Sequence, residues 1–320
     1  MYKLVEVQNL KKYFYQGGSP FKKKEPIKAL DDVSFYIKRN EILGLVGESG
    51  CGKTTCGKLI LRLLTPTAGT IFFDGKDITH LKQKQMIEIR RKMMIIYQDP
   101  YGSLDPRMTI GAAIAEPLEV HKLTSTKEEK ENKIIELMEK VGLTSDHINR
   151  YPHEFSGGQR QRIGIARALA TNPIFIVADE PVSALDVSIQ AQILNLLKDL
   201  QKAFGLTLLF ITHDLSVIKH TSDRIAVMYA GKLVELASKQ ELFRNPVHPY
   251  TRALLSAIPI PDPDRQTHYI PLSGEVPSLI HPPPGCRFHP RCPEATARCS
   301  SQTPELREVT KDHFVSCYPP

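Results

Sequence analysis

The chain has 320 residues, 41% of them hydrophobic and 24% charged, with a formal net charge of +7. This length allows one large domain or two modest ones with a buried core, and the composition is that of an ordinary soluble globular protein. No apolar run is long enough for a membrane-spanning helix, which excludes a helical integral membrane protein. The basic excess, part of it in the run Lys22 to Lys24, suits nucleic acid, an anionic membrane face or a merely solvated surface.

The sequence begins without the pattern of a secretory signal peptide. Met1-Tyr2-Lys3 leads directly into Leu4 to Leu10, whose alternating apolar residues predict a strand. We therefore expect a cytoplasmic protein whose association with a membrane depends on a partner.

Short apolar strands alternate with helical stretches in both halves of the chain. A polar, helix-forming stretch from Pro100 to about His153 separates the halves and is typical of an inserted helical subdomain. The predicted elements are strand Ile42–Val46, helix Lys53–Leu64, strands Thr70–Phe73 and Met93–Tyr97, helices Lys127–Val141 and Gly158–Ala170, strand Ile174–Ala178, helix Ser188–Phe204, and strands Thr207–Ile211 and Arg224–Met228. This alternation predicts a mostly parallel α/β sheet.

The composition changes after about Ala237. Prolines become dense, ending in the run Pro282 to Pro284. The sequence therefore predicts an irregular tail, which must be held by something other than a sheet.

A glycine-rich loop lies between a predicted strand and a predicted helix. Residues 47–54, Gly-Glu-Ser-Gly-Cys-Gly-Lys-Thr, have the phosphate-loop spacing G-x-x-x-x-G-K-[ST]. Glycines let backbone N–H groups curl round phosphate oxygens, and the next helix adds the positive end of its dipole. Lys53 is expected to reach the β- and γ-phosphates, and the Thr54 hydroxyl to ligate Mg²⁺. The predicted nucleotide-binding residues here are Gly47, Ser49, Gly50, Cys51, Gly52, Lys53, Thr54 and Thr55.

Two carboxylates follow a later apolar strand. Asp179 ends the stretch that begins at Ile174, and Glu180 comes next. A carboxylate at the carboxyl end of a central strand holds the Mg²⁺ shell in P-loop NTPases, so we assign this role to Asp179. Glu180 is placed to orient or deprotonate the attacking water.

Five further segments resemble the motifs of ATP-binding cassette (ABC) ATPases. Gln98 resembles the Q-loop, and Ser183 to Asp186 the D-loop. Phe155-Ser156-Gly157-Gly158-Gln159 resembles the signature LSGGQ, with Phe in place of Leu at an apolar packing position. His213 resembles the switch histidine. An aromatic residue after the first strand stacks on adenine in this family, and the register favours Phe14, with Tyr13 second.

The resemblance implies a fold and a domain division. The expected fold is α/β, a P-loop NTPase (RecA-like) core with an antiparallel β edge, an inserted helical subdomain and an irregular, cysteine-rich C-terminal extension. The expected boundaries are 1–98 and 160–237 for the ATP-binding core, 99–159 for the helical subdomain and 238–320 for the C-terminal extension.

It also implies a composite site that binds ATP and Mg²⁺ between two chains. Ser156, Gly157 and Gly158 begin a helix, whose free N–H groups and dipole favour an anion. In this family that anion is the γ-phosphate held by the opposite subunit, so Gln159 and Asp186 act near the same interface. Gln98 would contact Mg²⁺ or water, and His213 the γ-phosphate. Positioning and charge neutralisation then lower the barrier.

The tail resembles that of oligopeptide and dipeptide importer ATPases. The resemblance rests on Asn245 to Thr251, on Pro271 to Ser278 and on Pro283 to Phe288, while Tyr97 to Arg107 resembles the second of the two ATPases of such importers. The implied partners are a sister ATPase (in a hetero- or homodimer), two membrane permeases and an external peptide-binding protein. The implied place is the cytoplasmic face of the membrane. The cargo would be a short peptide, with nickel or another small solute as the alternative.

Four cysteines crowd the last tenth of the chain: Cys286, Cys292, Cys299 and Cys317. Four thiolates can hold zinc or an iron–sulfur cluster, and such a staple can replace a hydrophobic core. The gaps are wider than those of paired zinc or ferredoxin motifs, so spacing selects neither, and free or disulfide-bonded thiols stay open. The resemblance to [4Fe–4S] carriers among peptide-importer ATPases favours the cluster.

A soluble ABC protein that clamps nucleic acid is the alternative from another class, since the basic charge permits it. Such proteins usually carry two cassettes or a long coiled-coil insertion, and neither is present in this sequence. A metal-dependent regulator built on an ATPase scaffold is a further alternative, in which the cysteine-rich tail is the main actor.

Overall fold

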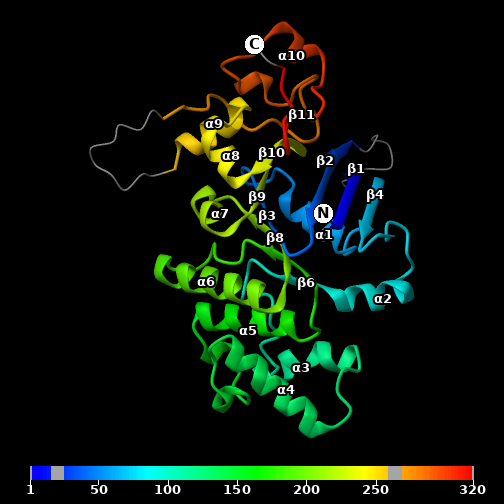
Figure 1. The fold of residues 1–320 in the computed structure, drawn as a ribbon, viewed down its shortest axis with the longest axis vertical. Coiled ribbons are helices and arrows are strands. Elements are labelled where there is room, and N and C mark those ends of the chain that lie inside the picture. Colours follow the sequence, from blue (N-terminus) through cyan, green and yellow to red (C-terminus); the bar gives the residue numbers. More distant parts are fainter. Residues whose placement is uncertain (1, 16–24, 259–268, 319–320) are drawn as a thin grey trace. The chain divides into compact units, whose positions relative to one another are not determined.

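The computed structural model describes residues 2–15, 25–258 and 269–318, so the basic run Lys22 to Lys24 lies outside the described residues. The chain divides into two compact units, a first unit of Met1–Thr79 with Thr212–Pro320 and a second unit of His80–Ile211 (Figure 1). The division into core, helical subdomain and C-terminal extension that the sequence predicts stays a prediction.

The first unit contains two groups of strands. One is an antiparallel sheet of order β2-β1-β4-β5, and the other has the order β11-β12-β10-β9-β3. Its elements are β1 (Lys3–Tyr15), β2 (Pro26–Lys38), β3 (Ile42–Val46), α1 (Lys53–Ile60), β4 (Ala68–Phe73), β5 (Lys76–Asp77), α7 (Leu215–Thr221), β9 (Arg224–Tyr229), β10 (Lys232–Ser238), α8 (Lys239–Arg244), α9 (Pro249–Ser256), η3 (His289–Arg291), α10 (Ala297–Ser301), β11 (Arg307–Thr310) and β12 (His313–Val315).

The core of the first unit lies along β3 and β9. These strands pair in parallel, from Leu43 opposite Arg224 to Val46 opposite Val227. Both are buried along their whole length, which explains why each reads as a continuous apolar run rather than an alternating one. The glycine-rich loop therefore begins at the end of a fully buried strand.

The second unit holds three parallel strands and the longer α-helices of the described residues. The strands have the order β8-β7-β6, with Met93 opposite Phe175 and Phe175 opposite Thr207. Its elements are α2 (Gln83–Lys92), β6 (Met93–Ile96), α3 (Ile110–Val120), α4 (Lys127–Lys140), η1 (Ser145–His147), η2 (Pro152–Glu154), α5 (Gly157–Leu169), β7 (Phe175–Asp179), α6 (Val187–Phe204) and β8 (Thr207–Thr212).

Local chemistry explains where the helices of the second unit begin and end. Hydroxyl groups cap three of them: Thr109 accepts from the Ala112 N–H at α3, Thr126 from that of Glu129 at α4, and Ser156 from that of Gln159 at α5. The helix α6 ends at Gly205, whose φ of 59° is left-handed.

The tail is not as irregular as its prolines predict. After β10 it forms α8 and α9, and β12 pairs with β10 so that Leu236 lies opposite Phe314. Figure 1 shows the orange and red part of the chain next to α8, α9 and β10. The expectation that something other than a sheet holds this segment was therefore wrong for its end, because that end extends a sheet.

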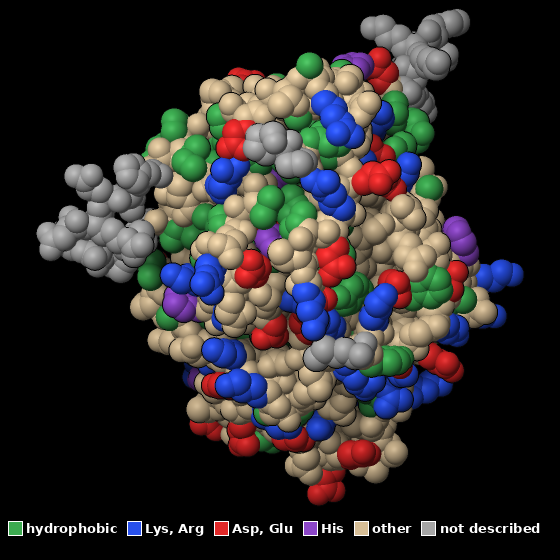
Figure 2. All heavy atoms as spheres, turned by 45° about the horizontal axis from the view of Figure 1, so that its top comes forward, with side chains coloured by type: hydrophobic (Ala, Val, Ile, Leu, Met, Phe, Trp, Pro, Cys, Tyr) green, Lys and Arg blue, Asp and Glu red, His purple; other side chains and the backbone are tan. Residues whose placement is uncertain are grey.

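In the part of the chain that the structure describes, no helix combines the length and apolar character needed to cross a membrane. On the face shown in Figure 2, Lys and Arg side chains lie interspersed with Asp and Glu. This face therefore favours the solvated interpretation of the basic excess over a single-signed binding field.

Candidate functional site

The glycine-rich loop joins β3 to α1, as its position in the sequence predicts. Gly47, Gly50 and Gly52 have φ angles of 153°, 78° and 104°. A Cβ atom on Gly47 would lie 2.1 Å from the carbonyl oxygen of Met228, and one on Gly52 would lie 2.4 Å from that of Ala29. The backbone shape of the loop and its close neighbours therefore both require glycine.

Lys53 and Glu48 are held at the centre of this loop. The Lys53 side chain is buried, and its Nζ donates to the carbonyl oxygens of Gly47 (2.7 Å) and Glu48 (3.1 Å). The Glu48 N–H donates to the hydroxyl oxygen of Tyr250 (3.0 Å). Its carboxylate accepts two hydrogen bonds from the Arg291 guanidinium, of 2.9 and 3.2 Å. The C-terminal extension thus contacts the phosphate loop directly.

The two cysteines near the loop are packing residues. Cys51 is 1% exposed and Cys56 is fully buried. Burial raises the pKa of the Cys56 thiol to about 12 and also raises that of Cys51. Both thiols are closed off from solvent, so they pack within the loop and helix rather than act as nucleophiles.

Two neighbouring aromatic residues near the end of β1, Tyr13 and Phe14, make different contacts. The Tyr13 hydroxyl donates to Asp31 (2.6 Å), and burial together with this bond raises the pKa of Tyr13 to about 12. The Phe14 ring is half-buried, with the Lys12 ammonium 4.9 Å from its centroid. Since Asp31 engages Tyr13, Phe14 stays the better candidate for stacking on adenine.

The second unit brings two predicted catalytic residues together. Asp179 is buried at the end of β7, and Glu180 follows with a left-handed φ of 46°. The Glu180 N–H donates to the carbonyl oxygen of Ile211 (2.9 Å). Gln98 Nε2 donates to a carboxylate oxygen of Glu180 (3.1 Å). A non-glycine residue in this conformation is strained, and such strain is common where a side chain must be aimed.

The signature segment forms the start of α5. Ser156 and Gln159 make a reciprocal capping box, with bonds of 3.0 and 3.3 Å. A Cβ atom on Gly158 would lie 2.5 Å from Cγ2 of Ile189, which explains the glycine there. Phe155 is buried, so the departure from LSGGQ falls on a packing position, as we expected. The first N–H groups of a helix have no partner within it and can bind an anion.

Asp186 and His213 lie at exposed ends of elements. Asp186 precedes α6, where its carbonyl oxygen accepts from the Gln190 N–H (2.8 Å). His213 follows β8, just before Asp214, which caps α7. The first unit therefore carries the phosphate loop, Phe14 and His213. The second unit carries Gln98, Asp179, Glu180, the signature turn (Ser156 to Gln159) and Asp186.

The segment Asn245 to Thr251 is held in place by a buried polar network. Glu235 on β10 is fully buried and accepts from the N–H groups of Val247 (2.8 Å) and His248 (3.0 Å) and from His313 (2.8 Å). Burial alone would raise the pKa of Glu235, but these hydrogen bonds outweigh it and lower the pKa. Glu235 thus stays charged and joins the start of α9 to the end of the chain.

His248 in the same network is neutral. Burial lowers the pKa of His248 to about 4, against the smaller opposing effect of Glu235. The neutral ring can therefore accept a hydrogen bond at Nδ1 from the Tyr250 N–H (3.1 Å). This bond caps α9 and directs Tyr250 into a cluster with Tyr229 and Phe288, whose ring centroids lie 4.7 to 5.4 Å apart.

The four tail cysteines line one cavity of about 320 Å³. The backbone N–H of Cys286 donates to the carbonyl oxygen of Cys299 (2.8 Å), which ties two of the cysteine segments together. Burial raises the pKa of Cys317 to about 11, and the other three thiols add to the shift. Across residues 2–15, 25–258 and 269–318, no three His, Cys, Asp or Glu side chains are grouped closely enough to hold a metal ion.

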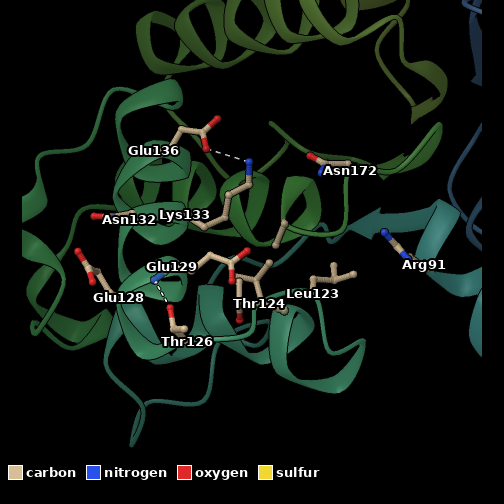
Figure 3. A pocket seen from close by; sticks show the side chains of 12 residues that line it. Arg91, Leu123, Thr124, Thr126, Glu128, Glu129, Asn132, Lys133, Glu136 and Asn172 are labelled. Atoms are coloured by element: carbon tan, nitrogen blue, oxygen red, sulfur yellow. Dashed lines mark hydrogen bonds and ion pairs between the residues drawn. The ribbon is translucent and has the colours of Figure 1, made fainter.

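The largest cavity among those described contains none of the predicted site residues. It measures about 640 Å³ and lies in the second unit, where Arg91, Thr124 and Asn172 lie around it (Figure 3). Lys133 donates to Glu136 at its edge (2.8 Å). Cavity size therefore does not locate the chemistry in this chain.

Comparisons with known proteins agree with the geometry. The family model described as "ABC transporter" matches residues 30–183, and the one described as "Oligopeptide/dipeptide transporter, C-terminal region" matches residues 234–299. The chain is 53% identical over 317 residues to the "Putative oligopeptide transport ATP-binding protein YkfD" of Bacillus subtilis, covering 98% of this chain and 95% of the relative. This chain belongs to the ABC transporter ATP-binding proteins. As a member of that family it binds and hydrolyses ATP.

Other relatives and solved structures support the same family. The oligopeptide transport ATP-binding protein OppF of Bacillus subtilis is 53% identical over 316 residues, covering 98% of this chain and 96% of that protein. The ATP-binding cassette MJ0796, solved as a dimer with ADP and Pi, has a TM-score of 0.66 and 31% identity over 73% of this chain and 98% of that chain. CbiO1 of Clostridium perfringens, at 24% identity and a TM-score of 0.65 over 77% of this chain and 92% of that chain, shares the fold.

Sequence reasoning missed the residues that support the loop from outside. Glu48 occupies a variable position of the phosphate-loop pattern, and Arg291 lies more than two hundred residues away. Glu235 lies just before the tail, in a stretch without a recognisable motif. One signal in the sequence could have indicated these supports. The segment between Cys286 and Cys292 contains two arginines and a phenylalanine, residues that a simple spacer between metal ligands does not require.

Proposed function

We propose that this chain powers import of di- and oligopeptides by closing on ATP with a second cassette. The proposal of a peptide cargo rests on the match of residues 234–299 to the oligopeptide/dipeptide transporter C-terminal region. It is supported by the relatives, whose names describe oligopeptide or peptide transport. The partners are a sister ATPase or a second copy, two membrane permeases and an external peptide-binding protein, at the cytoplasmic face of the membrane.

Each predicted residue has a role in this proposal. Lys53 binds the β- and γ-phosphates, and Thr54, Asp179 and Gln98 hold Mg²⁺ directly or through water. Glu180 activates the attacking water, and its contact with Gln98 supports this role. The remaining contacts to nucleotide come from Phe14, Gly47, Ser49, Gly50, Cys51, Gly52, Thr55 and His213, and from Ser156, Gly157, Gly158, Gln159 and Asp186 of the opposite chain.

The exposure of the signature turn supports the two-chain arrangement. Ser156 is exposed at the start of α5, and Asp186 is exposed at the start of α6. A helix N-terminus that faces solvent in one chain is available to an anion held by another. Binding ATP at such a seam joins the chains, and hydrolysis loosens them.

We propose in addition that Cys286, Cys292, Cys299 and Cys317 hold a [4Fe–4S] cluster. A single zinc ion needs four sulfur atoms about 2.3 Å from one point. Among the described residues no group of His, Cys, Asp or Glu is placed to hold a single ion, whereas all four thiols line one cavity of about 320 Å³, which has room for a larger body. Such a group would cross-link the loops of the C-terminal extension, a structural role.

Iron, sulfide and zinc analysis of anaerobically purified protein tests this assignment. We expect iron and sulfide in equal amounts, lost in Cys286→Ser and Cys299→Ser. Cys56→Ala is the matched control, because Cys56 is a buried thiol on α1 that does not line the cavity. Stoichiometric zinc, or no bound metal, would reject the cluster.

Uptake in cells that lack this chain tests the transport function. We expect loss of peptide uptake, with nickel and sugar uptake unchanged, and rescue by the wild-type chain but not by Glu180→Gln. Glu136→Gln, a change at an exposed carboxylate on α4, should rescue fully. Loss of nickel uptake alone would move the chain to a metal importer, and co-purification with DNA instead of membrane components would reject a transport role.

A further inference from the structure

Every polar group of Glu48 in the phosphate loop has a partner. Its carbonyl oxygen accepts from Lys53 (3.1 Å), within the loop. Its N–H donates to Tyr250 (3.0 Å), and its carboxylate accepts two hydrogen bonds from Arg291 (2.9 and 3.2 Å). Two of these three contacts come from the C-terminal extension, about two hundred residues away in the sequence.

The Arg291 contact has the geometry of a strong pair. Two guanidinium nitrogens meet two carboxylate oxygens, which fixes the direction of the side chain as well as its charge. The Arg291 side chain is 7% exposed and that of Glu48 is 26% exposed, so solvent screens the pair only in part. Arg291 Nη1 also donates to the hydroxyl of Tyr229 on β9 (3.3 Å). The guanidinium is therefore positioned before any nucleotide binds.

The segment from Cys286 to Cys292 carries a second support. Arg287 donates to the carbonyl oxygen of Ala230 and pairs with Asp31 on β2. Gly231, next to Ala230, donates its N–H to the carbonyl oxygen of Cys51 (2.9 Å), a residue of the phosphate loop. Phe288, between the two arginines, is buried. The segment is thus fixed to the framework at Arg287 and Phe288, a few residues before Arg291.

We propose that Arg291 and Tyr250 are positioning residues for ATP binding, which hold Glu48 and, through it, the phosphate loop in its binding shape. The inference rests on the proposed role of residues 47–54 in binding the triphosphate. Two effects follow from loss of Arg291. The loop backbone loses a fixed point, and an unpaired carboxylate remains beside the place where the triphosphate binds, which repels it. Both effects weaken binding of nucleotide rather than the chemical step.

Nucleotide affinity of the full chain, measured by titration with Mg·ATP and Mg·ADP, tests the proposal. We expect Arg291→Ala to weaken both by about tenfold, and Tyr250→Phe, which removes only the hydroxyl, by about threefold. Arg291→Lys keeps the charge but not the two parallel bonds, and should fall between wild type and Arg291→Ala. The KM for ATP should rise in the same order while kcat changes less than KM.

A double-mutant cycle shows whether Arg291 acts through Glu48. In a Glu48→Gln background, Arg291→Ala should change the affinity by less than about twofold, because the charge pair is already gone. An equal, tenfold effect in both backgrounds would overturn the proposal. So would a nucleotide affinity of Arg291→Ala within about twofold of wild type.

Two controls separate this proposal from other failures. Arg298→Ala removes another arginine of the C-terminal extension, one that contacts Gln302 and the Tyr318 ring, and should leave nucleotide affinity unchanged. A purely structural role for Arg291 would lower the unfolding temperature without changing affinity. If Lys53→Ala binds nucleotide normally, the phosphate-loop assignment itself fails. If Lys53→Ala loses binding and Arg291→Ala does not, only the present inference fails.

Discussion

The phosphate loop of the first unit and the predicted catalytic residues Gln98 and Glu180 of the second unit differ in how firmly they are held. Lys53 is buried, and the loop around it is fixed by glycine contacts, by Tyr250 and by Arg291. Gln98 is exposed, and its contact with Glu180 is a single hydrogen bond of 3.1 Å. Ser156, which begins the signature turn, is likewise exposed. The phosphate loop is therefore fixed by contacts within the chain, whereas Gln98 and Ser156 face solvent.

This difference separates binding from hydrolysis. A loop that is rigid before the ligand arrives loses little freedom on binding, so we expect one chain to be sufficient to hold nucleotide. Groups that stay exposed gain their full effect only when water is excluded and a neighbour completes the site. Binding variants should therefore cluster at the loop and its supports, and turnover variants at the exposed residues.

Glu180→Gln should have the largest effect and would sharpen the comparison. If Glu180 activates the attacking water as proposed, loss of its carboxylate should lower kcat by about 10³-fold, while affinity for Mg·ATP stays near wild type. ATP should then accumulate in the closed two-chain form, visible by size-exclusion chromatography. Wild-type turnover in this variant would reject the assignment of Glu180. Glu136→Gln serves as the control.

Lys53→Ala tests the role of the phosphate loop in nucleotide binding. Removing the buried ammonium should weaken Mg·ATP binding by about a hundredfold, because the phosphate charges lose their closest counter-charge. The measurement is direct nucleotide binding to the isolated chain. Lys58→Ala on the same helix α1 should bind as wild type. Unchanged affinity in Lys53→Ala would show that the loop does not hold the triphosphate.

Ser156→Ala separates the signature turn from its role as a helix cap. The change removes the α5 cap and should cost about 1 kcal/mol of stability, as Thr109→Ala should at α3. Only Ser156→Ala should also lower ATPase activity, by about tenfold, because in the proposed arrangement only that turn contacts nucleotide in a partner chain. Equal ATPase activity in the two variants would show that Ser156 acts only as a helix cap.

The smallest effect concerns the buried network that supports the loop. The pKa of His248 is about 4 in the folded chain, against about 6.5 when unfolded. Between these values the unfolded state binds the extra proton, so stability falls as the pH falls. From about pH 7 to about pH 5.5 this one group should cost about 1 kcal/mol. Glu235 and Arg252 face the ring with opposing effects on its pKa.

His248→Asn checks this pH dependence by urea unfolding. The asparagine oxygen can still accept from the Tyr250 N–H and cap α9, but it does not titrate. The variant should lose about 1 kcal/mol less than wild type over the same range. Identical pH profiles for the two proteins would show that His248 does not titrate as inferred.

Much of the α/β core followed from the sequence, because its signals are local. Strand Ile42–Val46 was predicted to the residue, and the phosphate loop is recognisable from eight consecutive residues. Helix α1 ends at Ile60 rather than Leu64, since Arg62 adopts a left-handed φ of 54° that the apolar spacing does not reveal. The role of each predicted site residue stays a prediction.

The supports of the loop could not be predicted, because they depend on contacts distant in sequence. Nothing near Glu48 indicates Arg291, and nothing near Glu235 indicates His313. The prolines of the tail predicted irregular structure, yet β12 pairs with β10. Local composition does not encode which strand a segment pairs with, and that pairing brings the C-terminal extension to the loop.

The most direct test of the account is a structure of the assembled Glu180→Gln transporter ATPases with Mg·ATP bound. The account predicts that the triphosphate on Lys53 of one chain receives hydrogen bonds from the Ser156 to Gly158 turn of its neighbour. If that turn lies away from every triphosphate in such a structure, ATP does not join the two chains as proposed.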